Sequence, residues 1–159
     1  MAVQFSDKDI NRLITEKKPL PDNYRNLIQV KTKQGHRERE LNIKGKEEND
    51  FWLILRQSIS NPIDFSVILA YRPQNSNQLF RLLRCNGKHE HTNTIEKVTF
   101  DDFHIHTATE RYQEIGARED GFAEPTNRFF NFQEAIEYML KNGNFEVPSD
   151  PQGLLFEEI

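Results

Sequence analysis

The stretch that decides the fold is FWLILRQSISNPIDFSVILAY, residues 51–71. Residues 51–55 are apolar at every position, and the apolar residues of 65–71 fall on both faces of an extended chain. Strands that are buried on both faces show such continuous apolar runs, and the Asn-Pro pair at 61–62 is a typical break between two elements. We therefore predict two central β-strands joined by a turn.

Further strands are indicated on both sides of this pair. Upstream, NLIQVKTK (26–33) and ERELNIK (38–44) alternate apolar and polar residues around a QGH turn, which predicts a β-hairpin with one solvated face. Downstream, LFRLLRC (79–85) predicts a fifth strand. FHIHTAT (103–109) is rich in β-branched and aromatic residues and favours another strand.

Two helices are expected at the ends of the domain. Ser6 stands three residues before Asp9 as an N-cap, and Asn131 and Glu134 form a similar pair before an apolar stripe that ends near Gly143. We predict a single α+β domain over residues 1–145, with an antiparallel sheet of about five or six strands and both helices packed on one face. Residues 146–159 form a tail that is either a loose end or a docking arm.

Composition narrows the class of protein. The chain carries a net charge of −4, has Cys85 as its only cysteine, and shows no signal peptide or apolar run long enough to cross a membrane. We expect a soluble cytoplasmic protein, a monomer or small homo-oligomer without a covalent cofactor, and Cys85 as a core thiol. Residues 25–46 hold seven Lys/Arg against two Glu, and residues 101–124 hold seven acids against two Arg. The basic hairpin either attracts a polyanion or is simply solvated surface.

Four of the five histidines lie between residues 87 and 113, in two H-x-H pairs. If 103–109 is a strand, Phe103 and Ile105 face the core while His104 and His106 stand together on the opposite face. We expect these to be polar surface positions, where replacement of a histidine by Ala leaves folding nearly intact. Glu110 and Tyr112 continue that parity if the strand runs on. A chain reversal at Asn86-Gly87 then brings the segment containing His89, His91 and Asn93 beside this face, next to Arg84.

One interpretation of this cluster is a metal site. His104, His106 and Glu110 have the H-x-H-x3-E spacing of cupin metal strands, although Val98 stands where that pattern has glycine and the later histidine segment is missing. With His91 as a further ligand, these residues form a candidate site for zinc or iron.

A second interpretation is metal-independent cleavage of RNA by a toxin that an antitoxin-like partner holds in check. It needs a base, an acid and a cation for the phosphorane. His106 or Glu110 is the candidate base, His91 or His104 the candidate acid, and Arg84 a better phosphate clamp than Arg111. The full set comprises His91, His104, His106, Glu110, Arg84 and Tyr112 as catalytic groups, with Asn93 and Arg111 as substrate contacts. We expect no cofactor in this case. A third interpretation is a binding module for a ligand or protein, without catalysis.

Other templates are absent from the chain. It contains no G-x-G-x-x-G, no P-loop, no G-x-S-x-G and no paired-cysteine zinc motif.

The chain resembles a family of small uncharacterised bacterial proteins with an H-x-N segment, an H-[LI]-H-x3-E-x-Y strand and a terminal amphipathic helix. The matching segments are HTN (91–93), HIHTATERY (104–112) and FFNFQEAIEYMLKNGNF (129–145). The resemblance implies that His91, His104, His106 and Glu110 form one site, without naming a reaction.

Overall fold

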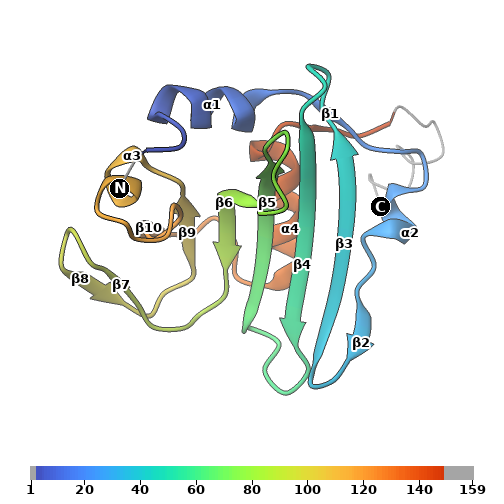
Figure 1. The fold of residues 1–159 in the computed structure, drawn as a ribbon. Helices are drawn as coiled ribbons and strands as arrows, with labels where there is room; N and C mark the ends of the chain where they lie inside the picture. Colours follow the sequence, from blue (N-terminus) through green and yellow to red (C-terminus); the bar gives the residue numbers. More distant parts are fainter. Residues whose placement is uncertain (1–2, 149–159) are drawn as a thin grey trace.

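The computed structural model describes residues 3–148, and these build a seven-stranded antiparallel sheet flanked by helices (Figure 1). The strand order is β10-β9-β6-β5-β4-β3-β2. The strands of this sheet are β2 (Lys31–Lys33), β3 (His36–Lys44), β4 (Asp50–Ser58), β5 (Phe65–Arg72), β6 (Phe80–Asn86), β9 (His104–Thr107) and β10 (Ala123–Pro125). The α+β class is confirmed, and the sheet has one or two strands more than the expected five or six.

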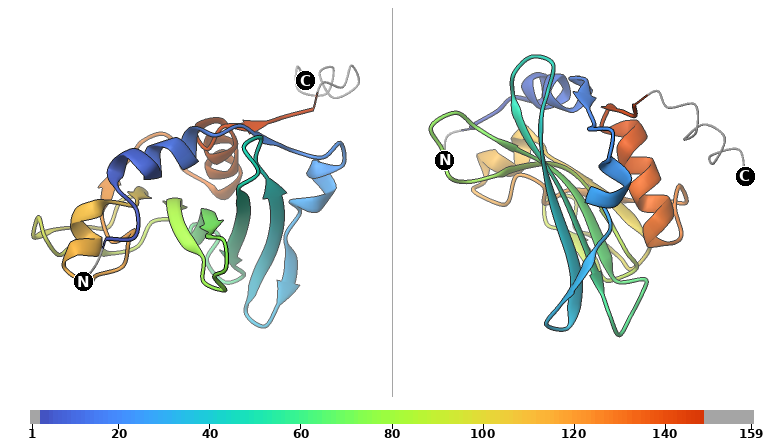
Figure 2. Two further views of the ribbon diagram at one scale, coloured as in Figure 1. Left: turned by 45° about the horizontal axis from the view of Figure 1, so that its top comes forward. Right: turned by 90° about the vertical axis from the view of Figure 1, so that its right-hand side faces the viewer.

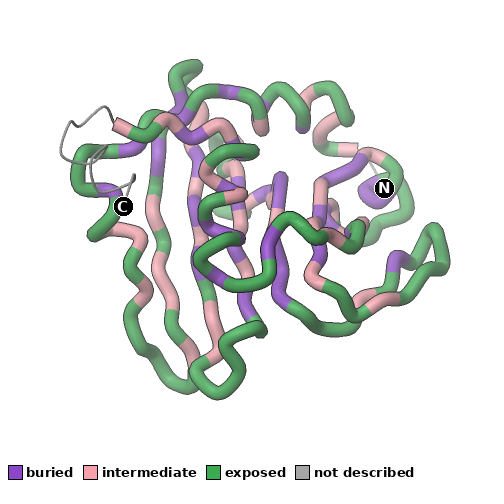
Figure 3. The backbone as a smooth tube through the Cα atoms, turned by 180° about the vertical axis from the view of Figure 1, so that it is seen from behind, coloured by how far each residue is buried: buried purple, intermediate pink, exposed green. Residues whose placement is uncertain are grey.

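The central strands follow the apolar runs of the sequence. Phe51, Leu53 and Leu55 of β4 alternate with half-buried residues, and Leu53 pairs with Leu69 of β5 in the middle of the sheet. These residues belong to one core cluster, which helices cover on one side of the sheet. Figure 3 shows the buried positions concentrated along the central strands, whereas the far ends of the outer strands are exposed.

Both expected helices are present and start where the caps predict. Helix α1 (Asp7–Thr15) begins after Ser6, whose side chain accepts from Asp9 N, and α4 (Phe132–Asn142) begins after Asn131, whose side chain accepts from Glu134 N. Both helices contribute side chains to the same core cluster. Figure 2 shows α4 lying along one side of the sheet and α1 crossing near the ends of the strands. None of the described helices is long and apolar enough to cross a membrane.

The two ends of the described chain are tied together. Short strands β1 (Lys18–Pro19) and β11 (Phe145–Glu146) pair in parallel, so the structured region runs past the expected boundary at residue 145. Lys18 is fully buried, and its Nζ donates to three backbone carbonyls, those of Ile14 at 2.8 Å, Glu16 at 2.7 Å and Gly143 at 2.7 Å. Residues 149–159, most of the predicted tail, lie outside the described residues.

The prediction for the upstream hairpin was only partly right. The hairpin of β2 and β3 is present, but Asn26 and Leu27, where the first strand was expected to begin, belong to the short helix α2 (Tyr24–Leu27). A second hairpin, β7 (His91–Asn93) with β8 (Val98–Phe100), forms a separate two-stranded sheet. Cys85 is a buried free thiol in the core cluster, as predicted, and burial raises its pKa to about 12.

Strand β9 is shorter than expected. It ends at Thr107, and residues Glu110–Glu114 form helix α3. The cause is Thr109, whose side chain accepts a hydrogen bond from Tyr112 N and caps the helix. The prediction that Glu110 and Tyr112 continue the strand was therefore wrong.

Candidate functional site

The pairing of β6 with β9 decides where the two central histidines point. Arg84 is opposite His106 and Asn86 is opposite His104, so all four side chains share one face of the sheet. The other face carries Phe65, whose ring packs against Phe132 of α4. The predicted parity is confirmed, because the histidines lie on the face that α4 does not cover.

The expected exposure of this face was wrong. His104 is 0% exposed and His106 is 2% exposed. The cover comes from the β7–β8 hairpin, whose Phe100 ring lies 5.5 Å from that of His104, and from the segment between α3 and β10. The histidines are therefore buried without lying under the last helix.

His91 completes a compact group with these two residues. Its ring centroid lies 4.6 Å from that of His106 and 5.5 Å from that of His104. One ring nitrogen from each of the three residues lies within 4.8 Å of the others. His89, which the family resemblance left outside the site, also lies nearby, with its ring 4.9 Å from that of His104.

Each of the three rings is held from outside by a backbone carbonyl. Nδ1 of His104 contacts Asp102 O at 2.7 Å, Nδ1 of His106 contacts Asp120 O at 2.7 Å, and Nε2 of His91 contacts Gly121 O at 2.9 Å. A carbonyl oxygen only accepts, so each of these nitrogens carries the proton. The lone pairs of the neutral rings are then on Nε2 of His104 and His106 and on Nδ1 of His91.

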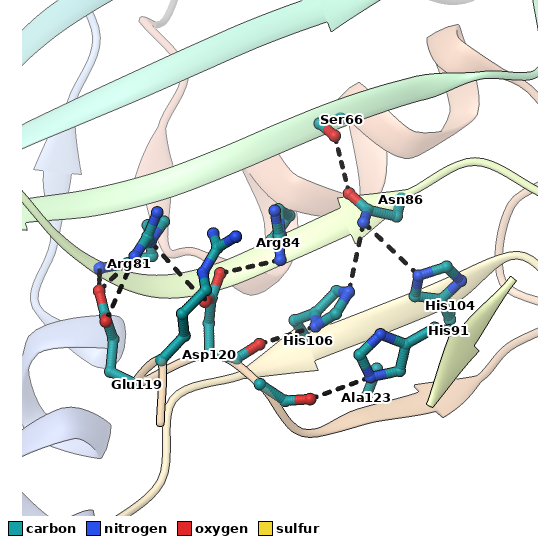
Figure 4. A network of polar contacts seen from close by, with 12 residues as sticks. Ser66, Arg81, Arg84, Asn86, His91, His104, His106, Glu119, Asp120 and Ala123 are labelled. Carbon is teal, nitrogen blue, oxygen red and sulfur yellow. Dashed lines mark hydrogen bonds and ion pairs between the residues drawn. The ribbon is translucent and has the colours of Figure 1, made fainter. Parts of the chain in front are cut away.

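Asn86 lies against the histidine group, with its amide directed toward His104 and His106 (Figure 4). Its Nδ2 lies 3.2 Å from His106 Nε2, 3.5 Å from His104 Nε2 and 3.4 Å from His89 Nε2. Ser66 Oγ donates to Asn86 Oδ1 at 2.9 Å and so fixes the amide with its NH2 group toward the imidazoles. Sequence reasoning treated Asn86 only as part of a turn.

Burial keeps the central rings neutral. Desolvation lowers the pKa of His104 to about 4 and, together with the nearby Arg84 charge, lowers the pKa of His106 to about 2. The pKa of His89 is also lowered, chiefly by desolvation. The second nitrogen of a neutral imidazole accepts hydrogen bonds or binds metal ions, but the ring lacks the acidic imidazolium proton that a general acid needs at pH 7.

Arg84 lies where the sequence placed it, beside His106 on the same face. Its Nη2 is 3.2 Å from Oδ2 of Asp120, whose side chain is completely buried. Asp120 thus contacts the histidine group through its backbone carbonyl and the arginine through its carboxylate. The sequence analysis did not identify Asp120 as a site residue, because it is one of seven acidic residues between positions 101 and 124.

Three other predicted site residues have different partners. Glu110 accepts from Asp7 N at 2.8 Å, and the buried Tyr112 donates through its hydroxyl to Glu96 at 2.7 Å. Arg111 is exposed and also pairs with Glu96, at 2.7 Å. No described contact joins these three side chains to the histidine group, because helix α3 directs them elsewhere. The ligand set with Glu110 is not assembled.

Asn93 supports the group instead of facing a substrate. It is 4% exposed, and its amide exchanges hydrogen bonds with both the N–H and the carbonyl of Ala123, at 2.9 and 2.7 Å. Its Oδ1 also lies 2.9 Å from Nε2 of His91. These contacts dock β7 on β10 and orient His91, so the Asn93 side chain has a structural role at this position.

A family model described as "Family of unknown function (DUF6978)" matches residues 5–144. The chain belongs to DUF6978. The match spans nearly all of the described region, including every member of the histidine group. Searches of curated proteins and of solved structures found no match to this DUF6978 chain.

Proposed function

We propose that the protein is a metal-dependent enzyme whose divalent ion is held by His91, His104 and His106. The single observation that carries the proposal is that one ring nitrogen from each of three histidines lies within 4.8 Å of the others, while each ring also donates through a nitrogen to a backbone carbonyl. Metal-binding histidines typically have this outer hydrogen bond, which fixes the tautomer and the orientation of the ring.

The donor set suits zinc or another divalent transition metal. Three histidines leave one coordination position for water or substrate, which is the usual arrangement in catalytic zinc sites. The ligand atoms of tetrahedral zinc are roughly 3.4 Å apart, and the three nitrogens here lie within 4.8 Å of one another. Small rotations of the rings, with displacement of the Asn86 amide, complete the approach. A divalent metal in such a site acts as a Lewis acid and lowers the pKa of a bound water.

Metal-independent RNA cleavage, the function favoured from the sequence, is the less well supported candidate. It requires a general acid that carries a proton near neutrality, whereas His104, one of the two candidate acids, is held neutral. Glu110 and Tyr112 have other partners. The ribonuclease hypothesis and the antitoxin-like partner stay predictions, and a protein-binding role stays the third candidate.

The decisive experiment is metal binding by protein without a histidine tag. We expect about one equivalent of zinc by elemental analysis, and a tetrahedral visible spectrum after Co²⁺ is exchanged into the site. His91→Gln, His104→Gln and His106→Gln should each weaken binding by at least about tenfold. His36→Gln is the matched control, because His36 lies on β3 and contacts Glu38 instead of the group.

Two outcomes would reject the metal site. One is the absence of stoichiometric zinc both before and after incubation with excess Zn²⁺. The other is equal binding by the His36 and His91 variants. His91 is the key position because it is only half-buried, so its variant should stay folded by circular dichroism even if those of His104 and His106 do not.

A further inference from the structure

Three arginines surround the buried carboxylate of Asp120 next to the histidine group, and Figure 4 labels two of them, Arg81 and Arg84. The distances to its oxygens are 3.2 Å from Arg84 Nη2, 3.4 Å from Arg118 Nε and 3.7 Å from Arg81 Nε. Charge-assisted hydrogen bonds are normally about 2.7–2.9 Å long. The guanidinium groups are therefore gathered around Asp120 without being tightly bonded to it.

What distinguishes this position is that the loosely contacted carboxylate of Asp120 is completely buried. Elsewhere on the same sheet face, Arg72 Nη2 lies 2.7 Å from Asp50 Oδ2. By contrast, three buried atoms at this position have no hydrogen-bond partner among residues 3–148. They are both carboxylate oxygens of Asp120 and the Nε of Arg84. Buried polar atoms usually have a hydrogen-bond partner, so these unpaired atoms indicate that a further polar group binds here.

The charges at this position favour an anion. Arg81, Arg84 and Arg118 face two carboxylates, those of Asp120 and Glu119, which leaves one positive charge in excess. Arg81 engages Glu119 through its backbone N–H and its guanidinium. A divalent ion at the neighbouring histidines would increase the positive charge further.

We infer that Arg81, Arg84 and Arg118 bind the phosphoryl group of a phosphoester substrate beside the metal site. The inference rests on the proposed function for the role of the metal. Guanidinium groups present paired donors that match the oxygens of a phosphate, and they are preferred over lysine where such geometry matters. Arg84 belongs to the same face as His106, in register on the adjacent strand, so a phosphate on the arginines lies next to the histidines.

Asp120 has a defined part in this arrangement. Its carboxylate keeps the three like charges together when no ligand is bound, which offsets their mutual repulsion. Because its contacts are long, the arginines can turn their free N–H groups toward an incoming phosphate without losing strong bonds. The carboxylate itself repels the ligand, so the three arginines must outweigh it.

The test is binding of inorganic phosphate to the full chain, measured by calorimetry with zinc bound and again with a chelator. We expect phosphate to bind, and Arg118→Gln and Arg81→Gln each to weaken it by about tenfold to a hundredfold, as for the loss of a hydrogen bond to a charged group. Arg56→Gln is the control, because Arg56 lies on the same sheet face but pairs with Glu38 at 3.8 Å. The phosphate affinity of the Arg56→Gln variant should equal that of the natural protein.

The outcomes separate this inference from the metal proposal. Zinc binding without phosphate binding overturns the anion site and leaves the metal site intact. Phosphate binding that disappears with the chelator and is insensitive to Arg118→Gln places the anion on the metal alone, which also overturns the inference. Arginine-dependent binding that persists in chelator supports it even if no zinc binds, in which case the metal proposal fails by itself.

Two further probes test the chemical class. Acetate should bind at least about tenfold more weakly than phosphate, because it offers fewer oxygens to the three guanidinium groups. Equal affinity for acetate contradicts a phosphoryl site. Phenyl phosphate and diphenyl phosphate then distinguish a monoester from a diester substrate, and binding of either with the same dependence on Arg118 supports the inference.

Discussion

His106 Nδ1 donates to the backbone carbonyl of Asp120 at 2.7 Å, across fourteen residues of chain. The carboxylate of the same Asp120 lies between Arg81, Arg84 and Arg118. One residue of the loop between α3 and β10 therefore sets the tautomer of a candidate ligand and also gathers the arginines. The two halves of the site are coupled through this residue.

Replacement of Asp120 by Asn should separate these two roles. The backbone carbonyl stays, so zinc affinity should change by no more than a few-fold. The loss of the buried negative charge leaves the positive charges of the three arginines without this counter-charge. We therefore expect the free energy of unfolding to fall by about 2 kcal/mol. Asp50→Asn, which breaks a pair with the half-exposed Arg72, should cost about 1 kcal/mol or less. Urea unfolding measures both, and equal losses would contradict the special role of Asp120.

Replacement of His104 or His106 by Ala should destabilise the protein. From the sequence we expected polar surface positions whose loss leaves folding nearly intact, but both side chains are buried and hydrogen-bonded. Each variant leaves a cavity and an unpaired carbonyl, at a cost of about 2–3 kcal/mol. His91→Ala should cost less, since His91 is half-buried. Thermal unfolding of the three variants checks this order, and a His91 variant that melts earliest would refute it.

The sequence revealed the elements that depend on local signals. Continuous apolar runs located β4 and β5, side-chain caps located α1 and α4, and the alternation of HIHT put both histidines on the face away from α4. These features follow from the period of a strand and from capping, which neighbouring residues determine.

The composition of the site was harder to infer, because it depends on segments that fold over the sheet. His104 and His106 are buried only because the hairpin of β7 and β8 and the loop before β10 cover them. Asp120 and Gly121 contribute backbone carbonyls, which leave no trace in side-chain patterns. The error at Glu110 was avoidable, because Thr109 followed by an acidic residue is a recognisable start of a helix.

Replacement of Lys18 by Met tests the tie between the ends of the domain. The ammonium group donates to three carbonyls and lies 4.5 Å from the centroid of the Phe51 ring. Methionine fills the space but leaves the three acceptors unpaired, so we expect a loss of about 2–4 kcal/mol. The neighbouring Lys17 is exposed, and Lys17→Met should change stability by less than about 0.5 kcal/mol. Similar losses for both variants would disprove the structural role of Lys18.

The metal-free protein should lose stability as the pH falls below 6.5. Burial lowers the pKa of His104 from 6.5 to about 4, so between these values the unfolded chain binds a proton that the folded chain does not. Stability is complete above pH 6.5 and declines toward pH 4, by on the order of 3 kcal/mol for His104. Protonation of Glu38 and Glu119, whose pKa values are lowered from 4.5, affects stability mainly below the pH range in which His104 contributes. Urea unfolding in chelator at pH 7.5, 6.5 and 5.5 measures the slope, which should flatten in His104→Asn.

Replacement of Asn86 by Asp should increase affinity for zinc. The Asn86 NH2 group now faces the nitrogens of His104 and His106, where it competes with a metal ion for the lone pairs. A carboxylate at this point removes that competition and adds an oxygen ligand with a negative charge, so we expect at least about a tenfold gain. Asn86→Ala is the control, since it removes the competing donor without adding a ligand and should give a smaller gain. Competition with a fluorescent zinc chelator measures both affinities. If the Asp variant binds zinc no better than the natural protein, the three histidines do not converge on a metal ion.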